Sequence, residues 1–384
     1  MALSIKLIAI ALVAVVCVTA AGVYLVTMDN GGDDGSSISI VDGSGTTISL
    51  GEPLTSVVTA NTNVPKAMKI LGLEDELKGL SFYSAGSDGS NWDQFSPMFP
   101  NAVHMAITPS MSAEEVKMIS DYVICPVSSM TVTAANQAAY ENLGITVIRL
   151  DCYGDTALED FEKLTILFGE TEKVMSSYKS YLDTYNLIVD AVATKVLAKG
   201  VDDTSFLYFM NSSNWFYNHT SAGSQMIEDV HGTNALKSIN GLDTTTVTND
   251  AALLGIKEVV KAADSSDNID IIFIRGATGT TTAALALTLW NGCLLSTDSI
   301  YSTLSAIGAN SDGQIFVFNS NMMSGPLSYV GYVLIAEAFG IDTGLDPATL
   351  IGLYNSTYGF NEATSGLLFM ITLTDGVASA TQLA

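Results

Sequence analysis

The sequence has few basic residues for its length. Only 15 lysines and arginines stand against 40 aspartates and glutamates in 384 residues, which gives a formal net charge of -25. A chain with this excess of negative charge is repelled by the phosphate backbone of nucleic acids and by anionic lipid surfaces. We therefore expect no nucleic-acid partner, and we interpret the acidic residues as a solubilising surface suited to saline surroundings.

Residues that carry metal or covalent chemistry are also scarce. The chain has 4 cysteines and 3 histidines, and none has the spacing of a zinc site or of a catalytic dyad. No nucleophile elbow, phosphate-binding loop or dinucleotide fingerprint occurs. The sequence therefore predicts a protein that is not an enzyme and that holds no resident cofactor or metal. Cys125 and Cys152 end two neighbouring predicted strands and could pair, but buried free thiols are the preferred interpretation.

One long apolar run lies at the amino end. Residues 7–27 carry no charge, follow Lys6 and precede Asp29. About 20 apolar residues are enough to cross a bilayer as a helix, and this charge asymmetry favours a cytoplasmic amino end. We predict an uncleaved membrane anchor and flexible tether over residues 1–37, with the folded part outside the cytoplasm. A cleaved lipoprotein signal before Cys17 is the competing interpretation, although its neighbouring residues fit that pattern poorly.

The rest of the chain shows one long helical pattern between two α/β-patterned segments. From Glu170 to Lys199, apolar or aromatic residues recur every three or four positions, which is typical of an amphipathic helix. At about 1.5 Å per residue this helix spans roughly 45 Å, which suits a link between two lobes. We predict an N-terminal α/β lobe over residues 38–156, a linker-helix region over 157–200 and a C-terminal α/β lobe over 201–384. Each lobe should be a mainly parallel sheet flanked by helices, with a cleft between the lobes.

Individual elements follow from the same patterns. Ser112 and Glu115 form a capping box, which predicts a helix start. In the first lobe we expect a hairpin over 38–50, strands over 56–60, 79–82, 122–126 and 146–150, and helices over 64–71, 112–119 and 134–143. In the second lobe we expect strands over 205–210, 269–274 and 314–318, and helices over 225–230, 283–289, 327–339 and 347–357.

The segments that follow the predicted strands hold the candidate ligand residues, because ligands of open α/β sheets bind beyond the carboxyl ends of the strands. These segments are rich in aromatic, methionine and hydroxyl side chains, which commonly line a pocket for a bulky, partly apolar ligand. The alternatives are edge packing for the aromatic residues, a salt bridge for Arg275, and a core or lid role for Met322. The predicted ligand-binding residues are Tyr83, Asp88, Trp92, Ser128, Ser129, Met130, Trp215, Tyr217, Arg275, Met322 and Ser324.

Several segments, taken in order, look like parts of one known family. Ile38–Pro53 and Ser56–Val58 look like its opening hairpin and first strand, and Ala67–Gly79 is similar to its first helix and the turn after it. The next two helix-strand units and the closing helices are matched by Ser112–Ile124, Tyr140–Ile148 and Leu334–Gly359. This order resembles the extracytoplasmic substrate-binding proteins of ABC importers for iron-siderophores, haem and cobalamin, whose two α/β lobes are joined by one long helix.

The resemblance implies capture of a metal chelate outside the cell and its delivery to a membrane permease with its ATPase. The cargo would be a ferric siderophore or haem. A neutral chelate or a corrinoid is as plausible, because the predicted pocket has no cluster of arginines for a strongly anionic siderophore. The family usually has an arginine where Ser56 stands and a permease-docking glutamate where Lys66 stands. Glu228 is the candidate docking residue of the second lobe.

Two other classes of protein remain as alternatives. The Asn-x-Ser/Thr triplets at Asn211, Asn218 and Asn355 and the wealth of Ser and Thr would suit a membrane-anchored adhesin or glycan-binding protein. No repeat array or separate β-sandwich module supports that alternative. A membrane-anchored hydrolase is disfavoured because no nucleophile and base occur at a suitable spacing.

Overall fold

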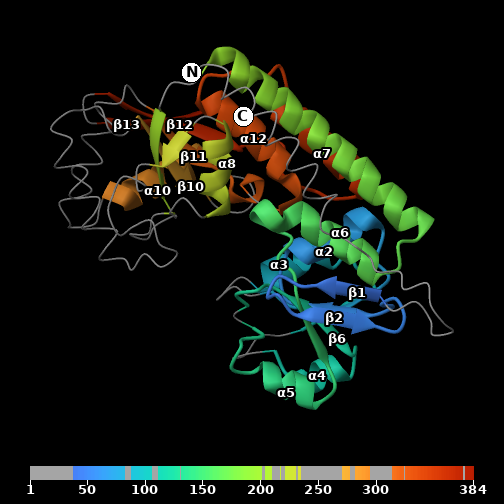
Figure 1. Ribbon diagram of the computed structural model, residues 1–384. Coiled ribbons are helices and arrows are strands. Elements are labelled where there is room, and N and C mark those ends of the chain that lie inside the picture. Colours follow the sequence, from blue (N-terminus) through green and yellow to red (C-terminus); the bar gives the residue numbers. More distant parts are fainter. Residues whose placement is uncertain are drawn as a thin grey trace. The chain divides into compact units, whose positions relative to one another are not determined.

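The computed structural model shows two compact units (Figure 1). Unit 1 comprises residues 1–152 and 158–178, and unit 2 comprises residues 153–157 and 179–384. Each unit contains one main β-sheet with helices packed against it. The structure describes residues 38–82, 88–105, 111–129, 131–200, 204–209, 217, 221–230, 232–234, 270–276, 282–294, 314–323, 325–374 and 377–384.

Unit 1 is built on a five-stranded sheet in which all neighbouring strands run parallel. The strand order is β5-β4-β3-β6-β7, and a separate hairpin, β1-β2, precedes the sheet. The predicted hairpin and the predicted alternation of strand and helix are confirmed. In chain order the elements are β1 (Ile38–Val41), β2 (Thr47–Leu50), β3 (Val57–Thr59), α2 (Asn63–Leu71), β4 (Leu77–Leu80), α3 (Asp88–Phe95), β5 (Val103–His104), α4 (Ala113–Lys117), β6 (Tyr122–Cys125), α5 (Gln137–Asn142), β7 (Thr146–Arg149) and α6 (Ala157–Leu167).

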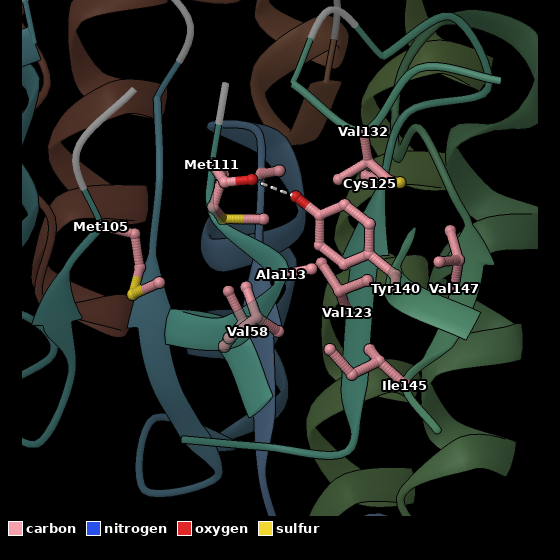
Figure 2. Close-up of a cluster of buried hydrophobic side chains, with 12 residues drawn as sticks. Val58, Met105, Met111, Ala113, Val123, Cys125, Val132, Tyr140, Ile145 and Val147 are labelled. Atoms are coloured by element: carbon pink, nitrogen blue, oxygen red, sulfur yellow. Dashed lines mark hydrogen bonds between the residues drawn. The ribbon is translucent and has the colours of Figure 1, made fainter. Parts of the chain in front are cut away.

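One core of unit 1 lies between this sheet and helices α4 and α5 (Figure 2). Val58, Val123 and Val147 contribute from three neighbouring strands, and the ring of Tyr140 on α5 packs among them. The Tyr140 hydroxyl donates to the carbonyl of Met111, and burial raises its pKa to about 12. The hydroxyl therefore stays protonated and serves as a structural donor.

The predicted capping box is confirmed on its serine side. The Ser112 hydroxyl oxygen accepts a hydrogen bond from the Glu115 amide at 3.3 Å, which satisfies one free donor at the start of α4. Cys125 and Cys152 are both buried and free, as the sequence favoured.

Unit 2 contains a six-stranded mixed sheet in the order β13-β12-β11-β10-β8-β9. β9, β8, β10 and β11 run parallel, and β12 and β13 are antiparallel to their neighbours. The expectation of a mainly parallel sheet omitted this closing hairpin. The elements are a 3₁₀ turn η1 (Gly154–Thr156), β8 (Thr204–Phe209), α8 (Ala222–Val230), β9 (Gly232–Asn234), β10 (Ile271–Arg275), α10 (Ala283–Leu294), β11 (Ile315–Phe318), 3₁₀ turns η3 (Ser320–Met322) and η4 (Gly325–Leu327), α12 (Ser328–Ala338), α13 (Pro347–Tyr358), β12 (Leu368–Thr374) and β13 (Val377–Gln382).

The long helix predicted from the sequence is α7 (Glu172–Lys199), which has 28 residues. Its residues up to Tyr178 belong to unit 1 and those from Lys179 onward belong to unit 2. The buried positions follow the predicted period. Within unit 2, the Tyr181 hydroxyl donates to the Pro326 carbonyl at 3.1 Å, so the helix is fastened to the segment that precedes α12.

The predicted membrane anchor lies outside the described residues. Across the residues that the structure does describe, no helix combines the length and the apolar character needed to span a bilayer. The anchor over residues 1–37 therefore stays a prediction.

Glu337 near the end of α12 makes the stability of unit 2 depend on pH. Burial and the nearby charges of Asp346 and Asp342 raise its pKa from 4.5 to about 7. Folding therefore favours the protonated form, and the stability that this form contributes is present below pH 4.5 and lost as the pH rises through 7. We expect Glu337→Gln to match the parent at pH 4 and to exceed it by roughly 1–2 kcal/mol at pH 8. Urea unfolding across this range tests this, and a pH-independent difference would contradict it.

Candidate functional site

Arg275 and Tyr217 meet at the carboxyl ends of the parallel strands of unit 2. Arg275 is the last residue of β10, and its Nη1 donates to the Tyr217 hydroxyl at 2.7 Å. The Tyr217 ring stacks on Tyr208 of β8, with ring centroids 4.6 Å apart. The structure thus brings together two residues that the sequence predicted as ligand contacts, and it adds Tyr208 as their support.

Tyr217 is held in place by its backbone. Its amide donates to the Tyr208 carbonyl at 2.9 Å, and its own carbonyl accepts from the side-chain amide of Asn234 at 3.1 Å. Asn234 is fully buried and also bonds the Ser224 hydroxyl at 3.2 Å. Hydrogen bonds that involve β8, β9 and α8 thus restrain the backbone of Tyr217, and its hydroxyl is held next to Arg275.

The guanidinium of Arg275 remains charged in this setting. Burial opposes the charge, but the neighbouring tyrosines, with Tyr217 the most important of them, together outweigh burial, and the net effect raises the pKa of Arg275. Burial also raises the pKa of Tyr208, so that phenol stays neutral. Among the described residues, no carboxylate forms a salt bridge with Arg275. The arrangement offers a cation and aromatic surface, which suits an anionic or partly aromatic ligand.

The segment after β11 also follows a strand of this sheet. Met322 of η3 is fully buried, so its side chain packs inside unit 2. The Asn319 side chain accepts from the Asn321 amide at 3.0 Å, and the Asn321 side chain donates to Glu362 at 3.2 Å. Met322 therefore anchors this segment in the core, in agreement with the packing alternative stated for it.

Glu228, the candidate docking residue, lies half-buried on α8. Its carboxylate accepts from the Asn234 amide at 3.1 Å, across the turn from α8 to β9. Its neighbour Asp229 accepts from the Tyr332 hydroxyl of α12 at 3.0 Å. Docking through Glu228 stays a prediction.

In unit 1, Trp92 of α3 stacks on His104 at the end of β5. Their ring centroids are 5.0 Å apart and the rings are inclined by 19°. Trp92 is half-buried and His104 is exposed. The indole is thus packed on one side by another ring at the carboxyl end of an edge strand, as the edge-packing alternative requires.

Sequence reasoning missed Arg149, which shapes the segment containing Ser128 and Ser129. Arg149 ends β7, and its Nη1 donates to the carbonyls of Pro126 at 3.0 Å and Val132 at 2.7 Å. Ser128 is exposed on this segment. The chain has only two arginines, and each is the last residue of a strand, so the argument that selected Arg275 could have selected Arg149.

The remaining predicted residues are outside what the structure describes. For Asp88, the first residue of α3, only the backbone is described. Within the described part of the chain, no group of three His, Cys, Asp or Glu side chains could hold a metal ion. The predicted contacts that lie wholly outside the described residues are Tyr83, Met130, Trp215 and Ser324.

Comparison with known proteins places this arrangement on a known fold. No family model and no curated protein matches the sequence. The TroA-like periplasmic binding protein FepB from Veillonella parvula is 15% identical, with 87% of this chain and 99% of that chain covered and a TM-score of 0.59. CeuE from Helicobacter pylori is 15% identical, with 85% and 97% covered and a TM-score of 0.58.

A third solved structure is an ABC transporter substrate-binding protein from Listeria monocytogenes. It is 15% identical, with 75% of this chain and 98% of that chain covered and a TM-score of 0.51. At this level of identity the likeness shows the fold. The fold expected from the resemblance is therefore confirmed, and it is that of TroA-like periplasmic binding proteins.

Proposed function

We propose that the chain is the extracytoplasmic solute-binding component of an ABC importer and that it captures an iron chelate, either a siderophore or haem. The observation that carries the proposal is the Arg275–Tyr217 pair at the carboxyl ends of parallel strands, where this fold class binds its ligands. The Listeria protein of this fold is named as an ABC transporter component, and CeuE was solved as a nickel–histidine complex. A metal chelate is thus a cargo that the fold can hold.

The chemistry of such a site is holding rather than conversion. The Arg275 guanidinium can pair with anionic oxygens of a chelate, and the half-buried Tyr217 side chain can pack against its apolar surface. The proposal includes delivery to a permease with its ATPase and an N-terminal anchor that keeps the folded part outside the cytoplasm. A corrinoid remains the alternative cargo, because one guanidinium is too few for a strongly anionic siderophore.

Removal of the Arg275 charge should weaken chelate binding. We expect Arg275→Met to lower the affinity for a ferric siderophore of low negative charge on the order of tenfold, because one charge-assisted pair is lost. Tyr217→Phe, which deletes the hydroxyl that holds the guanidinium, should have a smaller effect in the same direction. The measurement is calorimetric titration of the full chain.

A matched control is available in the same unit. Lys195 is an exposed cation on α7, and Lys195→Met removes the same charge away from the strand ends. It should leave the affinity unchanged. Equal affinities for Arg275→Met and Lys195→Met would exclude Arg275 from the ligand contacts.

A further inference from the structure

A polar cavity of about 340 Å³ lies along β7, at the edge of the unit 1 sheet. Three elements enclose it: the β1-β2 hairpin with its turn, helix α5, and β7 itself. This volume is at the small end of the range for ligand pockets. Its polar lining includes Ser44, Thr46, Gln137, Glu141 and Thr146.

The backbone of β7 supplies part of the wall. The Thr146 amide donates to the carbonyl of Asp121, the residue before β6, at 2.8 Å, and the Leu150 amide donates to the carbonyl of Cys125 in β6 at 3.0 Å. In a β-strand, the N–H and C=O of one residue point to one side of the strand, and those of the next residue point to the other side. Thr146 and Leu150 point to β6. Val147 and Arg149 therefore direct theirs to the opposite side, away from β6, and both residues line the cavity.

The hairpin engages this outer edge at Arg149. The Arg149 amide donates to Asp42 Oδ2 at 2.9 Å, and its carbonyl accepts from the Gly43 amide at 2.7 Å. Val147 lies one step earlier on the same edge. The hairpin therefore covers this edge of β7 at Arg149. Val147 still presents one N–H donor and one C=O acceptor, which are enough to pair with one amide group of a ligand.

The charged residues that line the cavity are two buried ones, Asp42 and Arg149, and one exposed carboxylate, Glu141. Asp42 and Arg149 are 4% and 5% exposed. Asp42 is held by the hairpin turn, and Arg149 donates to Gln137 Oε1 at 2.7 Å as well as to backbone carbonyls. Glu141 is exposed and accepts from the Gln137 side chain at 2.7 Å through one oxygen. Lys117 also reaches this rim, where its ammonium donates to the Gly144 carbonyl at 3.4 Å, but Asp121 pairs with it. The carboxylate of Glu141 therefore leaves the mouth with a net negative charge.

We propose that this cavity, the β7 edge cavity, binds a small molecule that carries an amide next to a cationic amine, as at the amino end of a short peptide. The amide pairs with the outward N–H and C=O of Val147, and the ammonium group pairs with Glu141. The hydroxyls of Ser44, Thr46 and Thr146 surround the remaining polar atoms. This site is separate from Arg275 and Tyr217, so it does not depend on the proposed transport of a chelate.

Two probes test the proposal on the full chain. L-alanyl-L-alanine amide carries both groups, and its N-acetyl derivative lacks the cation. We expect the first to bind at least fivefold more tightly and to shift the Val147 amide resonance in ¹H–¹⁵N NMR spectra. Failure of both probes to move that resonance would overturn the proposal.

Variants assign the two contacts. Glu141→Gln should reduce the affinity for the cationic probe to that for the acetylated probe. Glu115 is an exposed carboxylate on α4, and Glu115→Gln should change the affinity for neither probe. Val147→Pro removes the outward N–H and leaves the pairing with β6 possible, so it should abolish binding of both probes. If Val147→Pro fails to fold, the Glu141 comparison still decides: an unchanged preference for the cationic probe in Glu141→Gln overturns the proposal.

Discussion

Gly331→Ala should destabilise unit 2 by about 3 kcal/mol. A Cβ at this position of α12 would lie 1.9 Å from the carbonyl oxygen of Met322 and 2.7 Å from Cε of Met226. The Met226 side chain can move aside, but the Met322 carbonyl is backbone and cannot rotate away. The helix and the segment after β11 would have to separate, which exposes the buried Met322 side chain.

Gly352→Ala on α13 is the matched control. A Cβ there would meet nothing within 4 Å, and a glycine within a helix costs about 1 kcal/mol relative to alanine. This variant should be slightly stabilised. Urea unfolding followed by circular dichroism measures both variants, and equal stabilities would show that α12 does not rest against the Met322 backbone.

Arg149→Met should destabilise unit 1 by roughly 3–5 kcal/mol, since it removes one partner of a buried polar network. Three acceptors, the carbonyls of Pro126 and Val132 and the side chain of Gln137, would lose their donor. Each buried acceptor left without a partner costs about 1–3 kcal/mol. The segment that carries Ser128 and Ser129 would lose its hydrogen bonds to the side chain at position 149 and keep the bond from the Val127 amide to Asp151.

The comparison for this variant is Lys117→Met. Lys117 pairs with Asp121 on the exposed face of unit 1, and both side chains are substantially exposed. Loss of such a pair costs at most about 1 kcal/mol. In urea unfolding, Arg149→Met should therefore lose several times more free energy of unfolding than Lys117→Met. A loss for Arg149→Met no larger than that for Lys117→Met would refute the structural role of the guanidinium.

Most of the fold could be predicted because local patterns determine it. Apolar runs such as Tyr122–Cys125 and Ile271–Arg275 are inner strands with parallel neighbours on both sides, and such strands are apolar on both faces. The hairpin at Asp42 and the period of α7 are equally local signals. Capping and turn residues then set the boundaries to within a few residues.

Only the second strand of the closing hairpin β12-β13 lacks a local signal, because the first strand, Leu368–Thr374, is an apolar run that sequence patterns could have revealed. The second strand, Val377–Gln382, consists mostly of small and hydroxyl residues. Its first residue is 70% exposed. Such a segment has no apolar alternation, and it becomes a strand because it pairs with β12. Pairing of this kind is a tertiary effect.

The site was only partly predictable, because its contacts join distant parts of the chain. Position at a strand end selected both Arg275 and Tyr217, but their hydrogen bond spans 58 positions of sequence. The support from Tyr208 and Asn234 depends on which strands are neighbours. Arg149 was missed because it lies inside a predicted strand. Its side-chain hydrogen bonds, however, go to the segment that follows β6, the neighbouring strand of the sheet.

The most direct test of the proposed function is a thermal-shift measurement on the full chain with ferric siderophores, haem, cobalamin and bare metal ions. A ligand that binds only the folded state stabilises it by about 2.7 kcal/mol at a hundredfold excess over its Kd. The account predicts a raised Tm with one class of chelate and none with bare metal ions. An unchanged Tm with every chelate would contradict the assignment of this chain to chelate capture.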